Sequence, residues 1–103
     1  MRHLDSEREL VAELLVMANR CSNACDIKGW EKDWKEGGSY LHLEASEFVE
    51  SLRGKHGIPE HEVADVLFVL LAMVKHHNVN LQETIKYINE KLEKIEYDTC
   101  TLR

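Results

Sequence analysis

The sequence has few residues that interrupt helices and no segment with the pattern of a strand. One proline and five glycines are spread over 103 residues, and no region alternates apolar and polar side chains over a strand's length. This scarcity is typical of a helical bundle with short connections. The glycines fall at Gly29, at residues 37–38 and at residues 54–57, and a further boundary lies near residues 76–80. We therefore expect one all-α domain over residues 1–103, built as a four-helix bundle.

The sequence also has few cysteines, no net positive charge and no long apolar run. The three cysteines are odd in number and accompany no secretion signal, so free thiols are expected, and no C-x-x-C or H-x-x-x-H pair suggests structural zinc. The formal net charge of −6 disfavours binding to a nucleic-acid polymer. No apolar run approaches the roughly 20 residues that span a bilayer, and the first residues lack the layout of a signal peptide. These absences predict a soluble, cytoplasmic protein with no membrane partner.

The first helix is expected to begin near Ser6, which can form a capping box with Glu9. A loop over residues 26–39 holds Trp30 and Trp34 among charged residues. Either these rings fold back over the core, or they form an aromatic wall for a planar ligand such as a nucleobase. The helix before this loop carries apolar residues on one face: Leu10, Val11, Leu14, Ala18, Cys21 and Cys25.

The second and third helices are expected over residues 39–53 and from Pro59 onward. Proline is tolerated in the first turn of a helix, where its missing N–H has no intrahelical partner. Between residues 63 and 74 the third helix is apolar on every face except at Asp65, which predicts the central and most buried helix. The second helix has a narrower apolar stripe, made by Leu41, Ala45, Phe48 and Leu52.

The fourth helix is expected to begin after Asn80, whose side chain can cap it together with Glu83. Its apolar residues follow alternating steps of four and three, as in a coiled-coil seam. This seam packs either within the monomer or across a dimer axis. Because the third helix has more apolar surface than three neighbours can cover, we expect a homo-oligomer, either a dimer or a tetramer. The seam consists of Leu81, Ile85, Ile88, Leu92 and Ile95.

Two pairs of acidic residues carry most of the chemical information. Glu44 and Glu47 lie three apart on the second helix, and Glu62 and Asp65 lie three apart on the third, so each pair faces one way. If the two helices pack antiparallel, the four carboxylates converge and need a divalent cation to offset their repulsion. Carboxylate oxygens suit Mg²⁺, with Mn²⁺ as a substitute. The alternatives are solvated helix faces or, for Asp65 among its apolar neighbours, an arginine partner or a capping role.

These residues resemble the signature of the MazG-like all-α nucleoside triphosphate pyrophosphohydrolases. The likeness lies in E-x-x-E within LEASEFVESL, in E-x-x-D within EHEVADVLFVLLAM, and in NVNLQETIKYINEKLEK with its Asn-Glu-Lys run. Two positions depart from the family pattern. Leu43 stands where many members have a further glutamate, and Asn80 stands where an aspartate often opens the last helix.

The resemblance implies a homo-oligomeric bundle that hydrolyses (deoxy)nucleoside triphosphates to the monophosphate and pyrophosphate, as an enzyme that cleanses the nucleotide pool. It implies that Mg²⁺ is held by the four catalytic acids Glu44, Glu47, Glu62 and Asp65. Among these, Glu47 is the candidate for orienting or deprotonating the attacking water. The alternative is a non-catalytic interaction or nucleotide-sensing module with a structural metal. The substrate-binding candidates are Trp30 and Trp34 for the base, Asn89 for sugar or base, and Lys91 and Lys94 for the outer phosphates.

Overall fold

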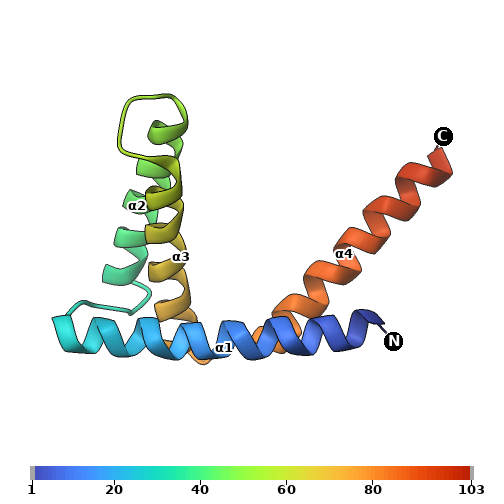
Figure 1. The fold of residues 1–103 in the computed structure, drawn as a ribbon, viewed down its shortest axis with the longest axis horizontal. Helices are drawn as coiled ribbons and strands as arrows, with labels where there is room; N and C mark the ends of the chain where they lie inside the picture. Colours follow the sequence, from blue (N-terminus) through green and yellow to red (C-terminus); the bar gives the residue numbers. More distant parts are fainter. Residues whose placement is uncertain (1, 103) are drawn as a thin grey trace.

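Four helices account for the architecture. The computed structural model describes residues 2–102, with side chains for residues 6–98, and this part of the chain contains no strand. The helices are α1 (Arg2–Lys28), α2 (Glu36–Leu52), α3 (Pro59–His76) and α4 (Leu81–Leu102). α2 and α3 form an antiparallel hairpin that stands on the C-terminal part of α1, and α4 extends away from that hairpin (Figure 1). None of the described helices is long and apolar enough to cross a membrane.

The first two helices begin earlier than the sequence predicts. The expected start of the first helix near Ser6 is wrong, because α1 already begins at Arg2 and includes Ser6. Residues 2–5 contain neither glycine nor proline, so nothing local stops the helix from extending. α2 begins at Glu36 rather than at residue 39, because the Asp33 carboxylate accepts the backbone N–H groups of Glu36 and Gly37 at 3.0 and 3.3 Å.

The core lies where α1 crosses α3 and meets the start of α4. Its buried residues come from all three helices, and the predicted apolar face of α1 supplies half of them, although Leu10 of that face is exposed. Cys21 and Cys25 are free thiols, as expected, and burial raises the pKa of both. The buried cluster is Ala18, Cys21, Cys25, Leu71, Ala72 and Leu81, with Val11, Leu14, Phe68 and Val74 packed against it.

α3 is central but not fully buried. It packs against both α1 and α2, as expected of the central helix, yet Val63, Leu67 and Leu70 stay exposed. Among the described residues, α1 has more buried residues than α3, so the expectation that this is the most buried helix is wrong for the single chain. The reason is the course of α4, which packs on α1 instead of covering α3. Its seam is divided in the same way. Leu81 and Ile85 are buried, whereas the seam residues from Ile88 onward are exposed.

The single chain is more extended than a compact domain of its size. Its radius of gyration is 16.3 Å, against about 13 Å for a compact chain of this length. Its accessible surface is 8168 Å² for 12.0 kDa, whereas a folded monomer of that mass exposes about 6,000 Å². The exposed apolar residues of α3 and α4 described above contribute to this excess of accessible surface.

The start of α4 gives a testable measure of local stability. Asn80 Oδ1 accepts the backbone N–H of Glu83 at 3.0 Å, which confirms the predicted N-cap. Replacing Asn80 with alanine is expected to lower the free energy of unfolding by about 1 kcal/mol, because one helix-end donor loses its partner. Urea denaturation at a fixed protein concentration measures this loss. Asn80→Asp keeps the cap and should match the wild type, and equal stability of all three proteins would contradict the assignment.

Candidate metal centre

The α2–α3 hairpin brings the two predicted acid pairs together. Carboxylate oxygens of Glu44, Glu62 and Asp65 lie within 4.8 Å of one another. Oxygens of Glu47 and Glu62 form a second group with a nitrogen of His56, inside the same 4.8 Å limit. The four acids therefore converge as expected, but in two adjoining groups that share Glu62.

Glu44 is the acid with the least favourable environment. Its Oε2 is buried and is without a hydrogen-bond partner in the described part of the chain. Burial, and next the negative charges of Glu47 and Asp65, raise the pKa of Glu44. A buried, unpartnered carboxylate oxygen beside two further carboxylates fits a hard divalent cation, which supplies the missing ligand and offsets the charge. The residues present at Glu44, Glu62 and Asp65 thus fit a hard divalent cation, the class to which the expected Mg²⁺ belongs.

Asp65 differs from the sequence-based expectation. Its place among apolar neighbours in the sequence predicts a buried carboxylate, but Asp65 is exposed. Its side chain lines a cavity together with Tyr40 and Glu44 of α2. The unpaired buried oxygen belongs to Glu44 instead. Glu62 is the more enclosed member of its own pair, with a side chain 12% exposed.

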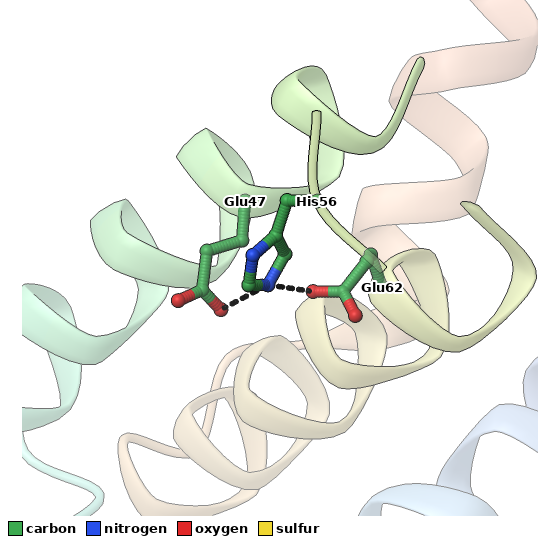
Figure 2. A group of neighbouring side chains, drawn as sticks. All are labelled: Glu47, His56 and Glu62. Carbon is green, nitrogen blue, oxygen red and sulfur yellow. Dashed lines mark ion pairs between the residues drawn. The ribbon is translucent and has the colours of Figure 1, made fainter. Parts of the chain in front are cut away.

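The second group is built around His56, in the turn between α2 and α3. His56 Nε2 lies 3.5 Å from Glu62 Oε1 and 3.9 Å from Glu47 Oε1, so the imidazole edge stands between carboxylates of two helices (Figure 2). Gly57 follows it with a φ of 54°. This φ favours glycine, and a Cβ on Gly57 would lie 2.6 Å from Glu62 Oε2, so the carboxylate would have to shift.

A cavity of about 300 Å³ adjoins the first acid group. Its edge carries Glu44 and Asp65, and Trp30 forms part of its wall. This volume lies at the lower end of the range of about 300–1,000 Å³ that is usual for small-molecule sites. The cavity therefore combines an aromatic and apolar lining with a carboxylate edge. The remaining lining residues are Cys25, Glu31, Tyr40, Phe68, Val69 and Ala72.

The loop that holds Trp30 is fixed to α1 at several points. Lys32 Nζ donates to Asp26 Oδ1 at 2.6 Å and to Ser22 Oγ at 2.9 Å. Gly29, with a φ of 72°, ends α1, and the Trp30 N–H donates to Cys25 O at 2.9 Å. The loop thus presents Trp30 from a defined backbone position.

The Trp30 ring meets side chains on two sides. It contacts Phe68 edge to face, with ring centroids 6.1 Å apart, and Lys28 Nζ lies 5.9 Å from its centroid. Trp30 thus packs against α3 and also lines the cavity, whereas its role as a wall for a planar ligand stays a prediction. Trp34 is 74% exposed and does not line this cavity.

The candidate residues on α4 lie apart from the acids within one chain. Asn89 Nδ2 donates to Glu7 Oε1 of α1, which ties α4 to α1 rather than to the hairpin. Lys91 and Lys94 are exposed on the segment of α4 that extends away (Figure 1). Their assignment to the substrate's phosphates stays a prediction, which now requires a second copy of the chain to bring them to the acids.

Sequence reasoning missed two residues of this region. His56 lies between Gly54 and Gly57 and between the two acid pairs, and this position in a short connection was the available signal. Tyr40 lines the cavity and precedes Glu44 by one helical turn, so helical spacing could have placed it there. Glu50, which lies three residues beyond Glu47 on α2, belongs to neither acid group and accepts a hydrogen bond from Arg53 Nη1 at 2.8 Å.

The raised pKa of Glu44 predicts how stability depends on pH without metal. A carboxyl that is protonated more readily in the folded state contributes stability that is fully present below its unfolded pKa of about 4.5 and is lost as the pH rises through its folded pKa. In EDTA, wild-type protein should therefore lose free energy of unfolding relative to Glu44→Gln as the pH rises from 4.5 to neutrality. Urea denaturation across this range measures the difference. Glu50→Gln is the matched control, and a constant difference between wild type and Glu44→Gln would contradict the expectation.

No family model, curated protein or solved structure matches this chain. The resemblance to the MazG-like enzymes therefore rests on the motif residues themselves.

Proposed function

We propose that this protein is a Mg²⁺-dependent nucleoside triphosphate pyrophosphohydrolase, which converts (deoxy)nucleoside triphosphates to the monophosphate and pyrophosphate. The observation that carries the proposal is the cavity that joins Trp30 to the carboxylates of Glu44 and Asp65. A ligand that fits both ends has a planar, apolar part and a part that accepts a divalent cation. A nucleotide has both, since its base stacks on aromatic rings and its phosphates bind Mg²⁺.

The charge of the site supports a metal-assisted reaction. A triphosphate meets an acidic edge in a chain of net charge −6, so it is repelled unless a cation lies between. Mg²⁺ held by Glu44, Glu62 and Asp65 would offset the charge of the phosphates and of the transition state. The motif resemblance supports the same assignment, because it implies that these acids hold Mg²⁺.

Base binding, exclusion of water and proton acceptance are assigned to side chains of the chain itself. Trp30 stacks on the base, and Phe68, Val69 and Ala72 exclude water around it. Glu47 stands outside the Glu44–Glu62–Asp65 group, so it remains able to accept a proton from the attacking water. Because stacking tolerates every base, this arrangement favours no particular nucleotide.

A homo-oligomer is part of the proposal. The exposed apolar residues of α3 and α4 and the excess surface of about 2,000 Å² over a compact monomer both support burial against a second copy. A second copy would also bring further cations to the outer phosphates. Lys91 and Lys94 are the candidates for that role, because they belong to α4, which extends away from the hairpin that carries the acids of the same chain (Figure 1).

The test is release of pyrophosphate and nucleoside monophosphate from a panel of ribo- and deoxynucleoside triphosphates, in Mg²⁺ and in EDTA. The expected result is equal amounts of the two products, formed only with Mg²⁺ and lost in Asp65→Asn. If Mg²⁺ raises the melting temperature of the wild type and no nucleotide is cleaved, the acids form a structural or sensing site. That outcome would overturn the enzymatic proposal in favour of an interaction module.

A further inference from the structure

The Mg²⁺ proposal gives no role to the imidazole in the group of Glu47, His56 and Glu62. The group combines two carboxylates with an imidazole, and an imidazole is a ligand preferred by zinc-like transition metals rather than by Mg²⁺. The three side chains come from α2, from the turn after it and from α3 (Figure 2). The hairpin therefore holds them together from three separate segments.

The distances within this group suit a cation better than a direct ion pair. Nε2 of His56 lies 3.5 and 3.9 Å from the two carboxylate oxygens, beyond the usual reach of an N–H···O hydrogen bond, which ends at about 3.2 Å. Two ligands that share a tetrahedral zinc ion through bonds of about 2.1 Å stand about 3.4 Å apart. The shorter of the two distances is thus close to the spacing of two ligands on one zinc ion, and the longer exceeds it by about 0.5 Å.

The surroundings keep this geometry in place and leave one side open. The Glu62 side chain is 12% exposed, and the turn at Gly57, whose φ of 54° favours glycine, passes close to its carboxylate. The side chains of Glu47 and His56 are 31% and 48% exposed, so a cation and its water ligands can reach the group from solvent. Three protein ligands with an open fourth position are the usual arrangement of an accessible zinc site.

We propose that Glu47, His56 and Glu62 form a second cation site, which takes a zinc-like transition-metal ion and shares Glu62 with the adjoining Mg²⁺ position at Glu44, Glu62 and Asp65. Binding of this ion does not depend on the nucleotide chemistry proposed above. Its consequence for turnover does rest on that function: an ion held by Glu47 removes the carboxylate that would accept the proton of the attacking water, so the ion inhibits hydrolysis.

The binding test is titration of the metal-free protein with Co²⁺, followed by its visible absorption. The wild type is expected to bind Co²⁺, and His56→Gln is expected to bind it at least about tenfold more weakly. Replacing a residue that only supports a metal ligand already lowers metal affinity by about tenfold or more, and replacing a ligand itself should lower it at least as much. His61→Gln is the matched control, because His61 is exposed and belongs to neither acid group. Equal affinity of His56→Gln and wild type would overturn the proposal, as would a loss of Co²⁺ binding in Glu44→Gln alone.

A second measurement avoids substitution at the site. In the wild type, Co²⁺ should broaden the NMR signals of the His56 ring before those of His61 or His42, and broadening of all three rings together would contradict the assignment. In excess Mg²⁺, the Co²⁺ concentration that halves pyrophosphate release should rise at least about tenfold in His56→Gln. If the wild type releases no pyrophosphate but the Co²⁺ results hold, the proposed function fails and this cation site stands.

Discussion

Replacing Glu47 with glutamine is expected to slow pyrophosphate release by about 10²–10⁴-fold, the usual contribution of a general base. Glutamine has nearly the same size as glutamate but cannot accept the proton of the attacking water. Glu47 is placed for this role because it lies outside the group of Glu44, Glu62 and Asp65 and its side chain is 31% exposed to solvent. Initial rates at saturating Mg²⁺ and nucleotide measure the effect.

Glu50→Gln is the control for this substitution. Glu50 lies one turn further along α2 and pairs with Arg53, away from both acid groups, so its replacement should leave the rate near that of the wild type. A slow Glu47→Gln protein is informative only if it remains folded, which circular dichroism checks. Turnover of Glu47→Gln at the wild-type rate would contradict the role given to this carboxylate.

The second large effect concerns assembly. We expect the wild type to elute as a multiple of 12.0 kDa and the double variant Ile88→Lys, Leu92→Lys to elute as a monomer. Both residues are exposed in the single chain and continue the seam whose first residues are buried. Two lysines there would have to lose water in the interface without partners of opposite charge, which prevents close packing. Light scattering after size-exclusion chromatography measures the mass.

The control for assembly is a lysine on the opposite face of α4. Glu90 lies half a helical rotation from the centre of the seam, so Glu90→Lys adds a lysine without touching the apolar surface. It should retain the wild-type mass. A monomeric wild type, or a double variant that assembles like the wild type, would contradict the proposed interface.

The parts of the fold that local chemistry determines could be predicted from the sequence. Pro59 begins α3 and Asn80 caps α4, because both effects involve residues within one helical turn. The predicted start of the first helix at Ser6 is wrong because a capping sequence does not stop a helix from extending when the residues before it also favour a helix. The exposure of α3 could not be predicted, because an all-apolar helix does not say which of its faces another helix or chain will cover.

The candidate site divides in a similar way. The convergence of the acid pairs follows from spacing and antiparallel packing, both of which can be inferred from the sequence. The buried, unpaired oxygen belongs to Glu44 rather than to Asp65. Which of the two is buried depends on how each helix is rotated about its own axis in the hairpin, and helical periodicity does not determine that rotation. His56 depends on the course of a glycine-bracketed turn, which only the three-dimensional structure defines.

Calorimetric titration of the metal-free protein with Mg²⁺, without nucleotide, tests the central claim that Glu44, Glu62 and Asp65 form a cation site. The expected result is Mg²⁺ binding by the wild type, a loss of affinity of at least about tenfold in Asp65→Asn, and unchanged binding in Glu50→Gln. Binding that is absent from the wild type, or equally strong in Asp65→Asn, would contradict the assignment of these carboxylates as metal ligands.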